Sequence, residues 1–445
     1  MIKINNDYTI EIEDLSYMGK GVGKVDGFTV FVDNALPGDR VHIIIYEVKK
    51  SFAFASIIAI LTPSKDRVQA VDPKLDTIPL QHLIYPKQLE YKRQWLFDTL
   101  RRNIDIDIHD ISPTIGMENP WAYRNKAQIP TRMFNQRFET GIFKSSSNEF
   151  IPVENYYIQD SDIDKALLIL KTIFTDYNIS AYNPNDDTGL IKHLIVRMGQ
   201  HTHEMMIIIV TNDNPIPFER ELVQSILEKI PNTVSIIQNI NPNKTNIIMG
   251  DSQRILFGSD VYMDELMGMK FAISSKSFLQ VNSTQTEKLY KVAMDFANIQ
   301  RDEVWLDAYC GIGTITLSAS LYAKHVYGVE IVSDAIKMAN LNKDINNIDN
   351  VTFEVGKSEI LIQSYKDLDG VIVDPPRAGL DAKFIDAILK TQPNKLVYIS
   401  CDPKTLSRDL KRLTEVYSIE KIQPVDMFPH TLHVETVVLM TRVDK

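Results

Sequence analysis

The chain has 445 residues, of which 44% are hydrophobic and 24% charged, and its formal net charge is -10. This composition is typical of a folded globular protein of roughly two to four domains, and it excludes disordered and fibrous classes. Only two cysteines are present, which excludes a disulfide-stapled scaffold and any metal site of three or four thiolates. The opening residues form no apolar signal core. No apolar run approaches the roughly 20 residues of a membrane helix, so we expect a cytoplasmic protein with no membrane partner.

The charge is unevenly distributed along the chain. Only residues 61–150 carry more basic than acidic side chains, and between residues 120 and 144 Glu139 is the single acid. An acidic protein meets a polyanion through a local basic surface, so we expect any such contact in this stretch. Its basic side chains are Arg124, Lys126, Arg132, Arg137 and Lys144.

Residues 1–60 are predicted to form short strands joined by glycine turns. The segment YTIEIEDL alternates apolar and polar side chains, and three further strand-like segments follow the turn region GKGVGKVDG. Several short strands without a helical period indicate a small antiparallel barrel. Near the turn, Tyr17, Lys20 and Lys24 are candidates for contact with nucleic acid and, equally, for solvated turn residues.

The middle of the chain mixes helices and strands. Residues 61–76 are polar and interrupted by proline, which is typical of a linker. Apolar residues recur at helical spacing over Tyr85–Arg101, and further helices are expected at 160–175 and 218–230. We find no internal repeat. The expected domains are a barrel at 1–60, an α+β domain at 61–275 and a third domain at 276–445.

After about residue 282 helices and strands alternate. The segments EVWLDAYCG, HVYGVEI, DGVIVDPP and KLVYISCDP are predicted to be buried strands, with helices between them. This pace of alternation predicts a mostly parallel sheet with helices on both faces. Ligands bind to such sheets outside the carboxyl ends of the strands, so polar residues at those ends are the candidate site.

The first candidate is the glycine turn DAYCGIGT. An apolar strand delivers Asp307, and Gly311 and Gly313 allow the backbone to pass close to a ligand. Glu330 ends the next strand, where a carboxylate can accept hydrogen bonds from both hydroxyls of a ribose. The third glycine of the dinucleotide fingerprint and the lysine of a phosphate loop are missing. We therefore favour S-adenosylmethionine over NAD, against the alternative of a plain tight turn with a surface glutamate.

Two further strand ends carry reactive side chains. Asp374 ends the strand VIVD, and the two prolines that follow make a rigid loop suited to holding a flat substrate. Cys401 ends the next strand, just before a helix that begins near Pro403, and a helix N-terminus favours a thiolate. We interpret the other cysteine, Cys310, as a small buried hydrophobe.

A closing strand carries the last candidates, within HVETVVLM. His433 and Glu435 are both possible proton acceptors, and the period-two alternation of a strand puts them on the same face. A simple carboxylate at a strand end is the alternative for Glu435.

At these residues the chain resembles the RNA (uracil-5-)-methyltransferase family, whose members make 5-methyluridine in ribosomal and transfer RNA. The resemblance covers nearly the whole chain, and the pair DPPR and SCDP is highly specific, whereas the glycine motif alone is not. It implies an α/β fold with a C-terminal Rossmann-like, S-adenosylmethionine-dependent methyltransferase domain. It also implies an N-terminal TRAM-like barrel that binds RNA and an α+β central domain. The similar segments are QHLIYPKQLEYKR, YRNKAQIP, GIF, FLQVN, DAYCGIG, GVE, DPPRAGL, ISCDP and HVE.

The resemblance implies a role for individual residues. Cys401 is expected to be the nucleophile that adds to uracil, and Glu435 the general base. The RNA contacts are expected at Arg124, Lys126, Arg132 and Arg377, and no obligate protein partner is evident. The residues expected to bind S-adenosylmethionine are Gln280, Tyr309, Gly311, Gly313, Glu330 and Asp374.

One departure from the family pattern is informative. Many relatives carry a cysteine cluster just before the QHL motif and a fourth cysteine further on, which bind an iron–sulfur centre. Here the stretch reads DPKLDTIPLQHL, and the place of the distant ligand resembles the region of Asn155. Two cysteines cannot hold such a cluster, so we expect none and no other metal. Packing alone is expected to hold the central domain.

Other functions remain open on the sequence. One is an amino-group or guanine methyltransferase of the same sheet type, which needs no thiol. Another is a non-catalytic RNA-binding factor in ribosome assembly, which needs neither Cys401 nor Glu435. Among uracil methyltransferases, the resemblance at the barrel and the QHL region favours ribosomal RNA, most specifically 23S ribosomal RNA, over transfer RNA as the substrate.

Overall fold

A computed structural model describes residues 2–144, 147, 149–213, 215–365 and 367–443. The described chain divides into two compact units. The first contains the residues up to Pro120 together with Cys401–Arg408 and Ile422–Thr436, and the second contains the rest. The division into three domains at residues 60 and 275 stays a prediction. Within the described residues, no helix is both long and apolar enough to cross a bilayer.

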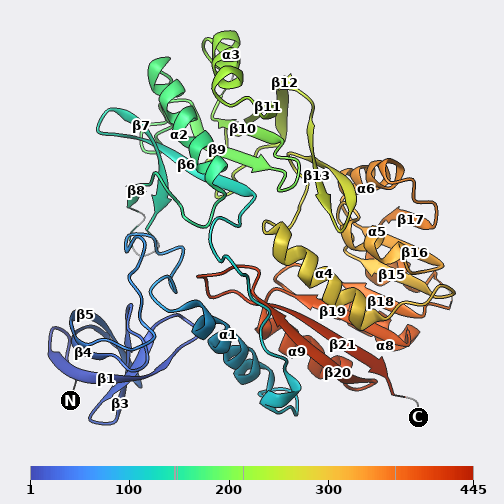
Figure 1. Ribbon diagram of the computed structural model, residues 1–445, viewed down its shortest axis with the longest axis horizontal. Helices are drawn as coiled ribbons and strands as arrows, with labels where there is room; N and C mark the ends of the chain where they lie inside the picture. The colour runs from blue at the N-terminus through green and yellow to red at the C-terminus, as the bar shows by residue number, and fades with distance from the viewer. Residues whose placement is uncertain (1, 145–146, 148, 214, 366, 444–445) are drawn as a thin grey trace. The chain divides into compact units, whose positions relative to one another are not determined.

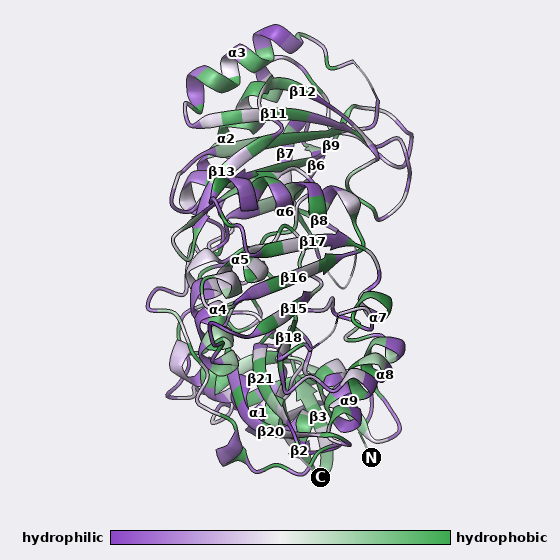
Figure 2. Cartoon of the chain, turned by 90° about the vertical axis from the view of Figure 1, so that its right-hand side faces the viewer, coloured by the Kyte–Doolittle hydropathy of each residue, from purple (hydrophilic) through white to green (hydrophobic). Residues whose placement is uncertain are grey.

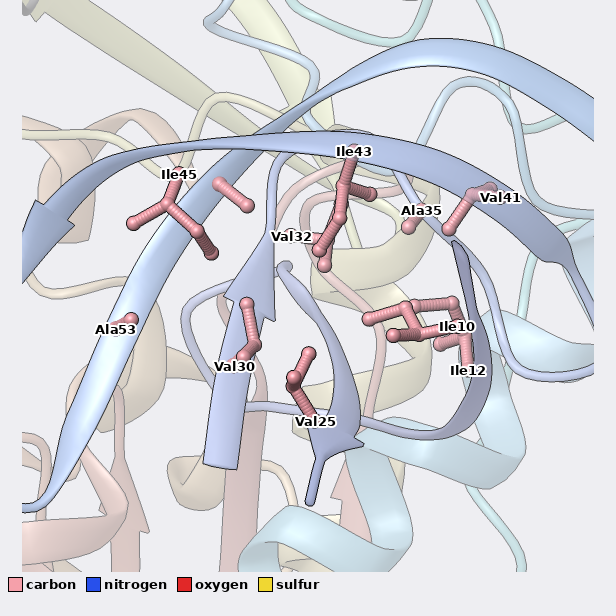
Figure 3. Close-up of a cluster of buried hydrophobic side chains, with 11 residues drawn as sticks. Ile10, Ile12, Val25, Val30, Val32, Ala35, Val41, Ile43, Ile45 and Ala53 are labelled. Atoms are coloured by element: carbon pink, nitrogen blue, oxygen red, sulfur yellow. The ribbon is translucent and has the colours of Figure 1, made fainter. Parts of the chain in front are cut away.

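The first unit begins with a closed five-stranded barrel, which confirms the expected N-terminal barrel. The barrel is not wholly antiparallel as expected, because strands Phe28–Val32 and Phe52–Thr62 pair in parallel. Inward-facing aliphatic side chains alternate with exposed ones along the strands and fill the interior (Figure 3). Gly23 permits a close approach of two strands, because a Cβ there would lie 2.6 Å from the carbonyl oxygen of Glu11. In spatial order the strands are β1 (Asp7–Leu15), β2 (Gly21–Val25), β3 (Phe28–Val32), β5 (Phe52–Thr62) and β4 (Arg40–Val48).

Helix α1 (Tyr85–Leu100) matches the predicted helix and packs against the barrel within the first unit. Trp95 donates a hydrogen bond from its indole N–H to the carbonyl oxygen of Leu15 at 2.9 Å. The stretch before α1, which the sequence shows to lack cysteines, contributes Leu80 and Leu83 to a buried cluster. Burial of these leucines joins the barrel to α1 through the hydrophobic effect. A short 3-10 turn, η1 (Ile108–Asp110), follows α1.

The second unit contains a mixed seven-stranded sheet on which two helices pack, as expected for the α+β part of the chain (Figure 1). A two-stranded hairpin follows this sheet, which the sequence pattern had not resolved. The sheet order is β12 (Ser252–Gly258), β11 (Thr233–Ile240), β10 (Met205–Thr211), β9 (Ile191–Met198), β6 (Lys126–Phe134), β7 (Arg137–Phe143) and β8 (Phe150–Pro152). The helices are α2 (Ser161–Asp176) and α3 (Glu219–Lys229), and the hairpin is β13 (Val261–Leu266) with β14 (Met269–Ser274).

The alternating helices and strands build a second seven-stranded sheet, which confirms the predicted α/β fold. Strands β15, β16, β17, β18 and β19 pair in parallel, and helices lie on both faces of this part of the sheet (Figure 2). The strand order is β17 (Val351–Val355), β16 (His325–Glu330), β15 (Val304–Ala308), β18 (Gly370–Val373), β19 (Lys395–Ser400), β21 (Glu435–Arg442) and β20 (Tyr417–Val425). The helices are α4 (Ser283–Ala297), α5 (Thr314–Ser320), α6 (Ser333–Ile345), α7 (Ser358–Leu361), α8 (Ala382–Thr391) and α9 (Pro403–Leu413).

Candidate active site

The glycine turn after β15 has the geometry of a ligand-binding loop. Tyr309, Gly311 and Gly313 all have positive φ, at 80°, 54° and 89°. A Cβ placed on Gly311 would meet nothing within 4 Å, so the backbone there borders open space. A Cβ on Gly313 would lie 2.7 Å from the ring of Phe353, so this glycine is required for packing. The two predicted glycines therefore serve different purposes, one toward a ligand and one toward the core.

Asp307, the last polar residue of β15, is fully buried beside this turn. Its Oδ2 accepts a hydrogen bond from the hydroxyl of Thr316 at 2.6 Å, whereas no described residue donates to its Oδ1. Burial raises the pKa of Asp307 to about 7, and the negative charges of Asp374 and Glu330 act in the same direction. A buried carboxylate oxygen with no donor in the protein is a place for a ligand donor. Sequence reasoning had treated Asp307 only as the start of the motif.

Asp374 follows β18 directly and lies in the same buried environment as Asp307. Burial raises the pKa of Asp374 to about 7, while a hydrogen bond with Gln280 opposes the rise. Glu330 ends β16 and is half-buried, and its Oε1 accepts from the backbone N–H of Val332 at 3.0 Å. The structure thus brings the predicted residues Gln280, Glu330 and Asp374 together around Asp307. Asp307 experiences the charges of both Asp374 and Glu330, and a buried carboxyl group perturbed in this way makes the edge of the sheet a candidate ligand site.

Gln280 is held by a residue that sequence reasoning missed. Asn125 is buried, and its side-chain amide donates to the carbonyl oxygen of Gln280 at 3.2 Å and to the hydroxyl of Ser283 at 3.0 Å. Its backbone N–H donates to the carbonyl oxygen of Val281 at 2.8 Å. Asn125 lies between two basic residues of the motif YRNK, and the sequence analysis considered only the charged residues of that motif. The polar residue inside a basic motif was the available signal.

Tyr309 points its ring against α8. The ring packs edge-on against Phe384, with centroids 5.7 Å apart, and burial raises the pKa of the Tyr309 phenol. Its backbone N–H donates to the carbonyl oxygen of Val329 at 2.9 Å, which ties the turn to strand β16. The left-handed backbone and the ring contact fix the direction of this side chain.

The two cysteines lie in contrasting surroundings, and neither is in a disulfide. Cys310 is buried, and burial raises the pKa of its thiol well above the ordinary value, which suits an inert hydrophobe. Cys401 is half-buried, directly follows the last residue of β19 and precedes α9, which begins at Pro403. Asp402 caps that helix by accepting from the backbone N–H of Lys404 at 2.8 Å. Cys401 therefore stands at a helix N-terminus, as predicted.

The pairing of His433 with Glu435 needs a correction. Strand β21 begins at Glu435, so His433 precedes the strand and the period-two argument does not apply to it. His433 is exposed and its ring packs on Phe428 at 5.9 Å, whereas Glu435 is buried. The alternation argument was wrong for His433 because this residue lies outside the strand, where the two-residue period of a strand does not apply. Cys401 and Glu435 belong to the same compact unit.

The predicted RNA-binding side chains do not form one cluster. Arg124 and Lys126 lie near Arg197: burial lowers the pKa of Lys126 to about 8, and the charges of Arg197 and Arg124 lower it further. Arg132, further along β6, donates to the carbonyl oxygen of Thr131 at 2.8 Å and lies over the ring of Phe143. Arg377 is exposed in the turn after β18. Arg197 is buried, and its guanidinium donates to the carbonyl oxygens of Ser274 and Ser277 at 2.8 Å and 2.9 Å, so its role is structural.

Residues 238–443 match the family described as tRNA (Uracil-5-)-methyltransferase, and residues 3–58 match the TRAM domain. The chain is 42% identical to an uncharacterized RNA methyltransferase of Enterococcus faecalis over 449 residues, which cover 99% of this chain and 98% of the relative. It is 43% identical to one from Clostridium acetobutylicum, with coverage of 100% and 99%. The chain belongs to the RNA (uracil-5-)-methyltransferase family. This methyltransferase uses S-adenosylmethionine, and these relatives leave no support for a non-catalytic factor.

The methyltransferase is also similar to a solved structure over its whole length. The Pyrococcus abyssi tRNA (uracil-54, C5)-methyltransferase in complex with S-adenosyl-L-homocysteine matches with a TM-score of 0.79 and 28% sequence identity. The match covers 98% of this chain and 100% of that one. The open space at Gly311 and the unmatched oxygen of Asp307 fit a nucleoside with a cationic tail. The acids of this site therefore suit the methyl donor.

We predict that cofactor affinity rises with pH. The pKa values of Asp307 and Asp374 are both about 7, so these acids lose most of their charge at pH 6 and regain it at pH 8. Charged carboxylates pair better with the ammonium group of the cofactor, and each group changes affinity by up to about tenfold per pH unit below its pKa. Calorimetric titration with S-adenosylhomocysteine should show tighter binding at pH 8, and Asp307→Asn should flatten the profile.

The unliganded methyltransferase should show the opposite trend in stability. Both acids have a folded-state pKa above the ordinary value of 3.8, so the native state binds more protons than the unfolded state between about pH 4 and 7. Stability therefore falls as pH rises through this window. An unliganded melting temperature that increases between pH 5 and 7 together with flat cofactor affinity would contradict both assignments.

Proposed function

We propose that the enzyme methylates carbon 5 of a uridine in RNA through a covalent bond between Cys401 and the uracil ring. The observation that carries the proposal is the contrast between the two cysteines. Cys310 is buried with a raised pKa, whereas Cys401 is half-buried, follows a parallel strand and stands before the helix α9. Only the second position suits a thiolate that must meet a substrate.

The chemistry follows from the weak nucleophilicity of carbon 5. The Cys401 thiolate adds to carbon 6 of uracil, and the resulting enolate makes carbon 5 nucleophilic. S-adenosylmethionine supplies the methyl group from its sulfonium. Glu435 then removes the proton from carbon 5, the bond between sulfur and carbon 6 breaks, and the ring double bond is restored. Glu435 must be ionised for this step.

The predicted cofactor residues divide the binding between them. Glu330 suits the ribose hydroxyls, and Asp374 with Gln280 forms a hydrogen-bonded pair beside the buried Asp307. The turn containing Gly311 offers open space for close approach of a ligand. Tyr309 completes the proposed set of contacts, and Gly313 contributes by letting the turn pack closely against Phe353.

The target uridine must leave its stack before a thiolate can reach carbon 6. We expect the enzyme to act on a looped RNA, whose unstacked bases are accessible. Arg124, Lys126, Arg132 and Arg377 are the proposed contacts with its phosphates, together with the TRAM barrel. Binding should weaken with rising salt in proportion to the phosphates neutralised.

The proposed substrate is ribosomal RNA, most specifically 23S ribosomal RNA. The resemblance of the barrel and the QHL region to the ribosomal branch supports it. The alternative is transfer RNA, which is supported by the name of the Pyrococcus abyssi structure.

Mass-spectrometric mapping of 5-methyluridine distinguishes the two substrates. In cells that lack the enzyme, we expect the modification to disappear from a position in 23S ribosomal RNA and to return with a plasmid copy. Loss from transfer RNA alone would establish the alternative, and an unchanged map of both RNAs would contradict uracil methylation.

A further inference from the structure

The segment that precedes Glu435 is fixed by an ion pair buried inside the first unit. We call residues 426–434 the base segment. Lys92 on α1 places its Nζ 2.6 Å from Oδ1 of Asp426 and 3.0 Å from the carbonyl oxygen of Phe428. Both charged side chains are fully buried, with 0% exposure. The ammonium group therefore holds the start of the base segment by its side chain and its backbone together.

Gln88 holds the middle of the same segment. Its Oε1 accepts from the backbone N–H of His430 at 3.0 Å, and its Nε2 lies 3.0 Å from Nδ1 of the same residue. The His430 ring is neutral, because burial and then the charge of Lys92 lower its pKa to about 3. Nε2 of Gln88 also lies 3.1 Å and 2.8 Å from the carbonyl oxygens of Leu80 and Leu83. The backbone N–H of Leu80 donates to the carbonyl oxygen of His430 at 3.0 Å.

Tyr85 completes this polar face of α1. Its hydroxyl donates to Oδ2 of Asp426 at 3.0 Å and accepts from the backbone N–H of Met117 at 3.0 Å. One face of α1 carries Tyr85, Gln88 and Lys92 at helical spacing, so a single polar stripe of the helix contacts the base segment. A helix normally buries an apolar stripe.

The stripe is expensive in free energy. Replacing a buried ion pair by apolar residues of similar volume is often neutral or stabilising, so stability alone does not account for Lys92 and Asp426. Buried polar networks accept one geometry only, because each donor needs its acceptor at the right place. The network therefore fixes where the base segment runs.

The other end of α1 reaches the helix that follows Cys401. Asn103, just beyond α1, donates to the hydroxyl of Ser407 at 2.9 Å, and that hydroxyl donates to the carbonyl oxygen of Thr99 at 3.2 Å. Ser407 lies on α9, whose first turn follows Cys401. Helix α1 thus contacts both the helix that follows Cys401 and the segment that precedes Glu435.

We propose that Gln88 and Lys92 are positioning residues that hold Glu435 in place for proton removal, through the base segment. The proposal rests on the roles assigned to Cys401 and Glu435 under the proposed function. It adds that α1, through its contacts with the base segment, sets the position of the general base. The stretch before α1 supplies the backbone carbonyls of Leu80 and Leu83 that orient Gln88.

The test is the variant Gln88→Met, which keeps the length of the side chain and removes its hydrogen bonds. Attack by Cys401 and methyl transfer precede proton removal, so a displaced Glu435 blocks only the last step. We expect kcat to fall about 10²-fold, as for misplacement on the order of 1 Å, and KM for RNA to fall with it, because a slow last step lets the covalent adduct accumulate. A methyl-labelled RNA–protein adduct should accumulate on a denaturing gel. The matched control is Gln94→Met on the exposed face of α1, where the amide contacts only Asp98 among the described residues, and it should behave as wild type.

A merely structural role of Gln88 gives a different result. Adduct formation and turnover would then fall together, without accumulation, and that outcome or a normal kcat overturns the proposal. If Gln88→Met does not fold, as judged by circular dichroism, the double variant Lys92→Met with Asp426→Asn takes its place. The double variant removes both buried charges at once, whereas Lys92→Met alone would keep the buried charge of Asp426 and remove the ammonium group that faces it. Accumulation of adduct supports the proposal, and its absence overturns it.

The two proposals fail separately. If Glu435→Gln accumulates no adduct, the role of Glu435 is wrong. If Glu435→Gln accumulates adduct and neither variant of the stripe does so, the base is correctly assigned and the positioning by α1 is wrong.

Discussion

Cys401→Ala should abolish methyl transfer while leaving cofactor binding intact. Without the thiolate, carbon 5 of uracil keeps its low nucleophilicity, and removing a catalytic nucleophile lowers the rate by a factor of about 10⁴ or more. Cys401 is not among the proposed cofactor residues, so affinity for S-adenosylhomocysteine should stay within about twofold of wild type. Single-turnover transfer of labelled methyl to a uridine-containing RNA, with calorimetry alongside, measures both quantities.

Cys310→Ala is the matched control for this prediction. It removes a sulfur from a buried position, so we expect some loss of stability and full methyl transfer in the folded fraction. Normal turnover by Cys401→Ala would refute the nucleophile. It would favour a direct transfer to nitrogen, as in the amino-group and guanine methyltransferases.

Glu435→Gln should trap the enzyme on its substrate. The amide cannot take the proton from carbon 5, so the methylated adduct cannot release Cys401. General-base removal typically costs 10²- to 10⁴-fold, and we expect turnover to fall within about that range. The trapped species should run on a denaturing gel as a labelled band that contains both protein and RNA. The band should be absent from the double variant Glu435→Gln with Cys401→Ala, which has no nucleophile.

His433→Ala is the control for the base. His433 is exposed and lies before β21, whereas Glu435 is the first residue of that strand and is buried. We expect near-normal turnover for His433→Ala. Strong impairment of His433→Ala, together with persistent turnover by Glu435→Gln, would transfer the role of base to the histidine.

The local elements of this fold were readable in advance because they depend on neighbours in the sequence. Apolar residues at helical spacing predicted α1, and alternation predicted the barrel strands. Extrapolating alternation beyond the end of a strand failed at His433. The hairpin of β13 and β14 was not resolved, because its short strands carry no clear period.

The candidate site divides in the same way. The motifs placed Cys401, Glu330 and Asp374 after or at the ends of parallel strands, as found. The motifs did not reveal Asn125, whose amide holds Gln280 from 155 positions away. Nor did they reveal Lys92, which pairs with Asp426 from 334 positions away. Contacts at such separations leave no periodic trace.

By itself the sequence determined the family and the places of the motifs at the ends of the parallel strands, and it led to the proposal of Cys401 rather than Cys310 as the nucleophile. These follow from residue type and short spacing, which fix local backbone chemistry. Only the tertiary structure decided that Asp307 and Asp374 have pKa values of about 7 and that a buried polar stripe of α1 holds the base segment. Both depend on removing charged groups from water beside partners distant in the chain, and only folding brings such partners together.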